Sequence, residues 1–231
     1  MSGSTYDAPL SPAQAFEPGD RAAVYRAIEE RRDMRHFSGG TVAPDTLQRL
    51  LLAAHHAPSV GFMQPWRFIR VQDRARRERL HQLVEQERVA TARALGERED
   101  AFMKLKVQGI LDAAEVFVVA LAGGRDKHVF GRRTMPQMDL ASVACAIQNL
   151  WLAARAEGLG LGWVSLFEPE ALRQEMSMPD DADPVAILCL GPVPGYYSQP
   201  MLEQLNWACR EALPQLVFDE TWDHPSSLFA A

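Results

Sequence analysis

The chain has 231 residues, of which 47% are hydrophobic and 23% charged, a balance typical of a globular protein rather than a disordered one. A net charge of −6 provides no global basic field for nucleic acid, and three scattered cysteines make neither a disulfide framework nor a zinc knuckle. The first residues lack the basic start and apolar core of a secretory signal, and no apolar run is long enough to span a membrane. We therefore expect a cytoplasmic protein that binds no nucleic acid, membrane or metal.

The chain is expected to begin with a flexible arm over residues 1–19, which ends at Pro18-Gly19. Asp20 suits the N-cap of a first helix. This helix carries apolar residues at helical spacing, and we expect these to face inward: Val24, Ala27 and Ile28.

A second helix is predicted from Pro44, because proline is favoured in the first helical turn. Its apolar stripe comprises Leu47, Leu50, Leu51 and Ala54. A strand follows over residues 66–71. The next segment, residues 74–106, is rich in arginine and glutamate, which predicts an outer helix that is broken near Gly96.

The second half of the chain alternates strands and helices. A continuous apolar run predicts a buried strand over 115–122, and shorter strands are expected over 161–165 and 185–190. The strongest helical pattern covers residues 139–157, with a short helix starting at Pro169. The apolar face of the long helix comprises Leu140, Val143, Ala144, Ile147, Leu150, Trp151 and Ala154.

The segment after Gly195 has little hydrophobic periodicity before Leu216. An ordered tail of this kind often reaches across to another subunit. No internal repeat and no clear domain boundary is visible along the chain.

Three arginines, Arg31, Arg32 and Arg35, crowd one short segment around the carboxylate of Asp33. Because guanidinium groups present a planar fork of donors to phosphate or carboxylate, this segment resembles an anion cradle. The alternative is that arginines at a helix end complement the helix dipole and stay solvated. Charge pattern alone leaves both interpretations open.

A second motif, residues 57–66, forms a tight turn between a helix and a strand. Its prolines fix the backbone and Gly61 permits close approach. Ser59 and Gln64 offer polar groups to a heterocycle, and Phe62 and Met63 offer an apolar wall. An ordinary structural turn is the alternative interpretation.

Several common catalytic and binding motifs are missing from the sequence. The glycines over 158–162 follow a helix rather than opening one, so they are not a dinucleotide fingerprint. We find no phosphate-binding loop ending in Gly-Lys-Ser/Thr, no nucleophile elbow and no histidine spacing completed by acids into a metal site.

Taken together, three motifs resemble the nitroreductase superfamily of flavin proteins: Arg31-Arg32-x-x-Arg35-x-Phe37, Pro58-Ser59 with Gln64-Pro65-Trp66, and Gly160-x-Gly162-Trp163. The resemblance is strongest to its 5,6-dimethylbenzimidazole synthase branch. Nitroreductases generally carry Ser where this chain has Asp33, and Asn where it has Phe62. Residues 146–151 and 162–165 also resemble that branch, and the whole match covers roughly residues 20–220.

The resemblance implies an α+β nitroreductase-like fold, with a central, mainly antiparallel sheet flanked by helices. It implies a single flavin domain over residues 20–231 and an intertwined homodimer, which the C-terminal tail would cross. Flavin would bind at the subunit interface.

The resemblance also implies that reduced FMN is a substrate, which dioxygen breaks into dimethylbenzimidazole, the lower ligand of vitamin B12, and erythrose 4-phosphate. A separate NAD(P)H flavin reductase would supply the reduced flavin. The residues that match the family's flavin-binding positions are Arg31, Arg32, Asp33, Met34, Arg35, Ser59, Met63, Gln64 and Ser165. Of these, Asp33 and Ser165 match the catalytic positions.

Asp33 is suited to proton transfer, because fragmenting the flavin requires a base that removes a proton from the first ribityl carbon. A carboxylate among arginines is expected to have a depressed pKa and to stay ionised. The alternatives are that Asp33 merely pairs with Arg32 or Arg35, and that Ser165 only satisfies backbone groups.

Two competing functions remain. One is a conventional FMN-dependent NAD(P)H nitro- or quinone reductase, against which Asp33 and Phe62 argue. The other is a non-catalytic flavin-binding protein, which leaves the acid at position 33 unexplained.

Overall fold

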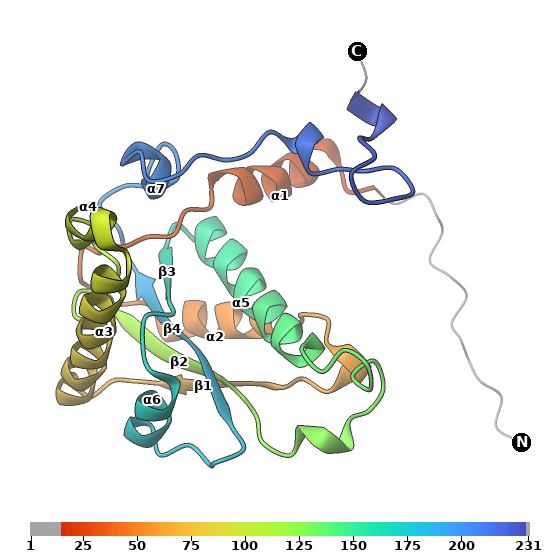
Figure 1. Cartoon of the computed structure of the whole chain (residues 1–231). Coiled ribbons are helices and arrows are strands. Elements are labelled where there is room, and N and C mark those ends of the chain that lie inside the picture. Colours follow the sequence, from red (N-terminus) through yellow and green to blue (C-terminus); the bar gives the residue numbers. More distant parts are fainter. Residues whose placement is uncertain (1–14, 230–231) are drawn as a thin grey trace, which may run out of the picture. The chain divides into compact units, whose positions relative to one another are not determined.

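The computed structural model describes residues 15–229, so most of the predicted arm over 1–19 lies outside the described residues. The chain divides into two compact units, residues 1–196 and 197–231. The larger unit is built on a four-stranded antiparallel sheet with the order β1-β2-β4-β3 (Figure 1). Its strands are β1 (Trp66–Arg70), β2 (Glu115–Leu121), β3 (Gly160–Val164) and β4 (Asp183–Gly191).

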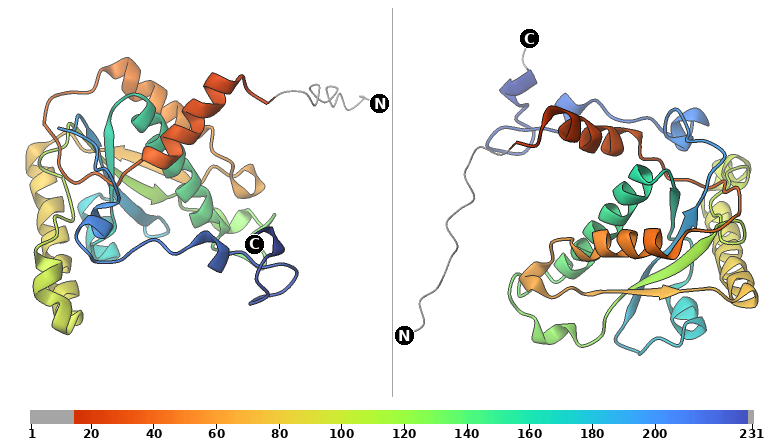
Figure 2. Two further views of the ribbon diagram at one scale, coloured as in Figure 1. Left: turned by 90° about the horizontal axis from the view of Figure 1, so that it is seen from above. Right: turned by 180° about the vertical axis from the view of Figure 1, so that it is seen from behind.

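Six α-helices surround this sheet in the described part of the larger unit (Figures 1 and 2). They are α1 (Pro18–Glu30), α2 (Pro44–His55), α3 (Arg74–Ala94), α4 (Glu99–Met103), α5 (Met138–Ala156) and α6 (Pro169–Glu175). Short 3-10 turns occupy Val60–Phe62, Gly96–Arg98 and Arg125–Lys127. The predicted elements are therefore present, including the break near Gly96.

The core has two halves, one on each face of the sheet. Because successive side chains of a strand point to opposite faces, Phe117 and Val119 of β2 pack with α2 and α5, while Val116 and Val118 pack with α3 and α6. All of β2 is buried. This double burial explains why its sequence is a continuous apolar run rather than an alternating one.

The long helix α5 packs across one face of the sheet and against α2. Its predicted apolar face is confirmed for Val143, Ile147 and Leu150, which are buried. Leu140 differs, because its side chain remains 45% exposed on the first turn of the helix.

The first helix departs from two predictions. It begins at Pro18 with Glu17 as its N-cap, so Asp20 lies within the first turn instead. The expectation that its apolar residues face inward is wrong for this chain alone, because no residue of α1 is buried. Val24 and Ile28 are each 48% exposed.

The smaller unit contains the short helix α7 (Met201–Gln204) and the 3-10 turns Leu213–Gln215 and Ser227–Phe229. A bridge between Phe218 and Pro225 closes its C-terminal loop, and the Phe218 ring lies 5.4 Å from the ring of Trp222. The single flavin domain and the dimer-crossing tail stay predictions.

Along residues 15–229, no helix combines the length and the apolar character needed to cross a membrane.

A buried ion-pair cluster fixes the start of α5. The Asp139 carboxylate accepts from Arg125 at 2.9 Å and lies 3.0 Å from Arg132. Arg125 also pairs with Asp183, whose side chain is 58% exposed. The loop before α5 is therefore tied to the helix through one carboxylate.

We predict that Asp139→Ala lowers the free energy of unfolding by about 3–5 kcal/mol, because it leaves the largely buried Arg132 without its counter-charge and Arg125 with only the exposed Asp183. Asp183→Ala is the matched control: it removes an exposed partner of the same Arg125 and should cost under about 1 kcal/mol. Urea denaturation of both variants checks this. Equal losses would contradict the structural role of Asp139.

Candidate functional site

The arginine segment leaves α1 in extended form and lies along β3. Asp33 forms a parallel bridge with Leu161, and the Met34 N–H donates to the Leu161 carbonyl at 3.0 Å. The Met34 side chain is fully buried. The segment therefore extends the sheet beyond β3 and is held at a defined register.

Two glycines of β3 make this close approach possible. A Cβ at Gly162 would collide with the Met34 carbonyl oxygen, and one at Gly160 would meet the side chains of Val193 and Met34. The sequence identified the Gly-x-Gly-Trp pattern only through a resemblance. Its physical reason is contact between the backbones of two neighbouring segments.

Asp33 and Arg35 together bind both backbone polar groups of one β3 residue, Trp163. Its Oδ1 accepts from the Trp163 N–H at 3.0 Å, and its Oδ2 accepts from Arg35 Nη2. The same Arg35 nitrogen donates to the Trp163 carbonyl at 2.8 Å. The Asp33–Arg35 pairing is thus observed, and Asp33 is also fixed to the strand that leads to Ser165.

The prediction of a depressed Asp33 pKa is wrong. Burial among protein atoms raises the pKa of the Asp33 carboxyl, and this outweighs the opposing Arg35 charge, the Trp163 N–H and the Arg31 charge. The Asp33 side chain still keeps 40% of its accessible surface. It is therefore a carboxyl that releases its proton less readily than usual and that ligands can reach.

The other two arginines have different surroundings. The Arg31 guanidinium lies 4.4 Å from the centre of the Trp151 ring, a cation–π geometry. Arg32 donates to the carbonyls of Glu29 and Arg31 at 2.6 and 2.9 Å, so it caps the C-terminal end of α1. Arg32 therefore behaves as the alternative interpretation expects of an arginine at a helix end. The Arg31 guanidinium instead packs on the face of the Trp151 ring.

Trp151 of α5 holds this end of α1 and was predicted only as a core residue. Its indole N–H donates to the Arg32 carbonyl at 3.1 Å. One helical turn later, Arg155 pairs with Glu30 and stacks on the Tyr196 ring at 4.1 Å. Helical spacing alone could not separate this anchoring role from packing.

The turn over residues 59–64 is closed by its own polar groups. The Ser59 hydroxyl accepts from the Gln64 N–H at 3.1 Å, so this serine serves the turn whether or not it also meets a ligand. Phe62 and Gln64 have positive φ values of 53° and 47°, which costs side chains about 1–3 kcal/mol each. A strained turn that the surroundings maintain is typical of a binding loop.

Helix α5 supports both parts of the site. Ser142, near its start, accepts from the Val60 N–H at 3.0 Å, while Trp151 holds the arginine segment. Trp151 lies nine positions after Ser142, which corresponds to about 13.5 Å along the helix at 1.5 Å per residue. Ser142 was not among the predicted site residues, and its sequence position on an apolar helix gave no signal.

The remaining predicted residues lie at the edges of these two parts. Ser165 is exposed directly after β3, two residues beyond the clamped Trp163 peptide. Met63 is partly buried within the turn. The structure thus brings Asp33, Arg35 and the β3 end together, and carries Ser59, Met63 and Gln64 on a separate turn.

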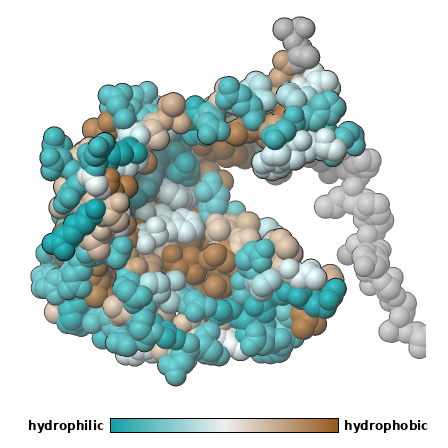
Figure 3. Space-filling view, viewed as in Figure 1, coloured by the Kyte–Doolittle hydropathy of each residue, from teal (hydrophilic) through white to brown (hydrophobic). Residues whose placement is uncertain are grey.

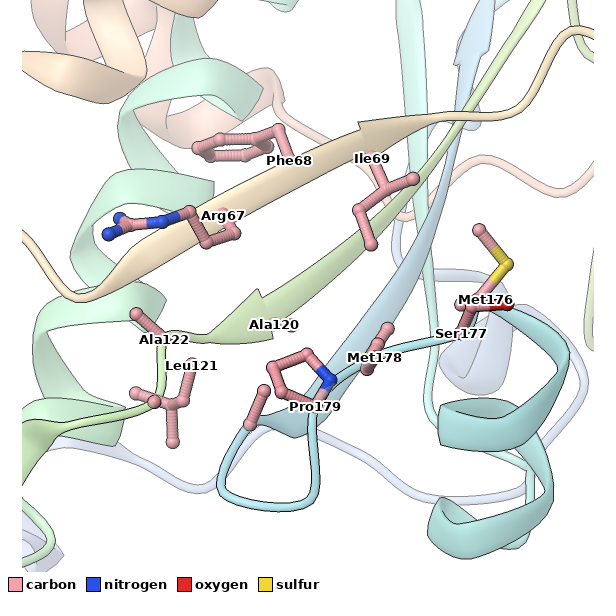
Figure 4. Close-up of a pocket in the computed structure, with 12 residues that line it drawn as sticks. Arg67, Phe68, Ile69, Ala120, Leu121, Ala122, Met176, Ser177, Met178 and Pro179 are labelled. Carbon is pink, nitrogen blue, oxygen red and sulfur yellow. The ribbon is translucent and has the colours of Figure 1, made fainter.

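A cavity of about 470 Å³ lies elsewhere, between the edge of the sheet and the loop after α6 (Figure 4). Ile69, Met176 and Met178 line it, and none of the predicted site residues does. It is therefore distinct from the arginine segment and the strained turn. In the part of the chain that the structure describes, no group of histidine, cysteine and acidic side chains could hold a metal ion.

We predict that Gly162→Ala lowers the free energy of unfolding by about 1–3 kcal/mol, because the new Cβ would push Met34 away from β3. The control is Gly195→Ala, where no heavy atom lies within 4 Å of the added carbon. Chemical denaturation should show a change within about 0.5 kcal/mol for the control. An unchanged Gly162→Ala protein would contradict the proposed close approach.

Comparisons with known proteins agree with this architecture. The model of the nitroreductase family matches residues 28–192. The chain is 41% identical over 203 residues to a protein of Rhodospirillum rubrum named 5,6-dimethylbenzimidazole synthase, covering 86% of this chain and 95% of that protein.

Two solved structures share the fold at low identity. The NADPH:FMN oxidoreductase of Vibrio harveyi complexed with NAD⁺ is 17% identical with a TM-score of 0.66, covering 88% of this chain and 80% of that one. Iodotyrosine deiodinase bound to FMN and 3-iodo-L-tyrosine is 20% identical with a TM-score of 0.63, covering 76% and 92%.

The predicted α+β fold is confirmed by these matches and by the antiparallel sheet. Because the family model matches most of its length and a relative is 41% identical to it, the chain belongs to the nitroreductase family.

Proposed function

We propose that the chain is a 5,6-dimethylbenzimidazole synthase, which uses dioxygen to fragment reduced FMN into dimethylbenzimidazole and erythrose 4-phosphate. The observation that supports this most is the reachable Asp33 carboxylate, which accepts from the Trp163 N–H two residues before Ser165. The 41% identity to the Rhodospirillum rubrum synthase supports it. FMN named in two structural neighbours supports a flavin as the ligand.

The residues present fit a flavin phosphate and a ring. Arg31, held over Trp151, offers a guanidinium fork for the phosphate. Arg32, the next residue, adds a second positive charge at the end of α1. The strained turn, with Phe62 83% exposed, offers an apolar wall for the ring. Ser59 and Gln64 provide polar groups on the same turn.

In this proposal Asp33 removes the proton from the first ribityl carbon. A general base works best when its pKa approaches the working pH, so the raised Asp33 pKa strengthens it as a proton acceptor. Asp33 must be ionised to act, which is the state that Arg35 and the Trp163 N–H favour. Ser165, exposed at the end of the same strand, would bind the flavin next to this base.

The assembly is proposed to be a homodimer with the flavin between subunits. Apolar side chains on α1 that the single chain leaves exposed support this, including Tyr25 at 59%. Hydrophobic residues also gather in the middle of the face that Figure 3 shows. A cytoplasmic location and supply of reduced FMN by a separate NAD(P)H reductase belong to the same proposal.

The test is anaerobic loading of the purified protein with chemically reduced FMN, followed by admission of air and mass analysis. We expect dimethylbenzimidazole and erythrose 4-phosphate in equal amounts. A conventional reductase would instead return intact, oxidised FMN and would consume NADPH at ordinary enzyme rates without a partner. Intact FMN with no NADPH consumption would favour a flavin-binding protein.

Asp33→Asn should lower product formation by roughly a hundred- to ten-thousand-fold, the effect of losing a general acid–base group. Binding of reduced FMN should survive or tighten, because removing an anion beside the arginines leaves more positive potential for the phosphate. Anaerobic titration followed by product quantification measures both quantities.

Asp45→Asn provides a matched control, since Asp45 is an exposed aspartate on α2 that pairs with Arg49. Its yield should equal that of the wild type. An unchanged yield in Asp33→Asn would remove Asp33 from the mechanism. Loss of flavin binding together with activity would favour a purely structural ion pair.

A further inference from the structure

Arg35 differs from the other arginines of the segment in what it contacts. One of its nitrogens, Nη2, donates both to the Asp33 carboxylate and to the Trp163 carbonyl, the latter at 2.8 Å. Its side chain is only 12% exposed, whereas that of Asp33 is 40% exposed. The arginine is thus the more enclosed member of the pair, and the carboxylate is the member that a ligand reaches.

These contacts close a hydrogen-bonded ring around the backbone of a single residue, Trp163. The Trp163 N–H donates to Asp33 Oδ1 at 3.0 Å, Arg35 bonds Oδ2, and the same arginine bonds the Trp163 carbonyl. Asp33 cannot rotate about its side-chain torsions without losing both contacts. By comparison, the Arg31 guanidinium lies 4.4 Å from the centre of the Trp151 ring and acts on Asp33 through its charge.

The charges around Asp33 give Arg35 a second effect. On its own segment, Arg35 and Arg31 lower the Asp33 pKa, Arg35 more strongly, while burial raises it. Strand β3 contributes the Trp163 N–H and has no titratable side chain. On β4 the buried Cys189 thiol has its pKa raised to about 11 by burial, so it stays neutral near pH 7.

We infer that Arg35 is a positioning residue that holds Asp33 oriented and ionised for proton removal, and that it acts through Asp33 rather than on the flavin phosphate. The proton-removal part rests on the proposed function. The effect on Asp33 itself does not, because it follows from contacts within the chain.

The experiment measures the titration of the Asp33 carboxyl by carbon-13 NMR in flavin-free protein, with the signal assigned by its absence in Asp33→Asn. Arg35→Gln removes the charge and the fork, whereas Arg35→Lys keeps the charge alone. Arg31→Gln is the matched control on the same segment. Anaerobic titration of reduced FMN gives the dissociation constant of each variant.

The contacts determine in which direction each substitution should move the pKa of Asp33. Because Arg35 lowers the Asp33 pKa, Arg35→Gln should move the titration midpoint to higher pH, and Arg35→Lys should move it less. Although Arg35 matches a flavin-binding position, Arg35→Gln should weaken FMN binding less than Arg31→Gln does. Arg31→Gln should weaken binding by roughly tenfold or more, the value of a lost charge-assisted hydrogen bond, with a smaller shift of the Asp33 midpoint.

An unmoved Asp33 midpoint in Arg35→Gln would overturn the inference, and so would a loss of FMN affinity equal to that of Arg31→Gln. If Arg35→Gln does not fold, Arg35→Lys decides, because a loss of the fork alone should still displace the midpoint upward. Absence of dimethylbenzimidazole from the wild type would reject the proposed function, yet the NMR result on flavin-free protein would stand.

Discussion

The site depends on the pairing of the arginine segment with β3. Met34 can approach Leu161 because Gly160 and Gly162 carry no Cβ, and this pairing sets the register that places Asp33 against the Trp163 peptide. A single hydrogen-bonded bridge thereby converts a loop after a helix into an edge of the sheet. The chemistry proposed for Asp33 needs that rigidity, because a base must lie within hydrogen-bond reach of the proton it removes.

Helix α5 is the second element on which the site depends. It packs on the sheet with its apolar face and uses polar groups at two points, Ser142 and Trp151, to hold the strained turn and the arginine segment. Its start is fixed in turn by Asp139 between two arginines. The two halves of the site therefore share one rigid support, although they lie far apart in sequence.

Much of the fold could be predicted from periodicity. The buried run of β2 and the apolar face of α5 are strong patterns, because both elements bury side chains over their full length. The face of α1 could not be predicted, since its apolar spacing is the same whether the partner is this chain's core or another surface.

The site was less accessible to sequence reasoning. The residue types around Asp33 indicated an anion and a proton acceptor, but charge counting gave the wrong direction for its pKa, because it omits burial. The same counting treated the three arginines as one cradle. The contacts of Arg31 with Trp151 and of Arg35 with the Trp163 carbonyl, which separate their roles, join residues more than a hundred positions apart and depend on tertiary packing.

The central claim is that β3 holds Asp33 where it can take a proton from the ribityl chain. A crystal structure with FMN reduced and kept anaerobic tests it most directly. We expect an Asp33 oxygen about 3 Å from the first ribityl carbon, while the Trp163 N–H and Arg35 remain bound to the carboxylate. A flavin seated on the arginines and the strained turn with Asp33 remote from that carbon would contradict it.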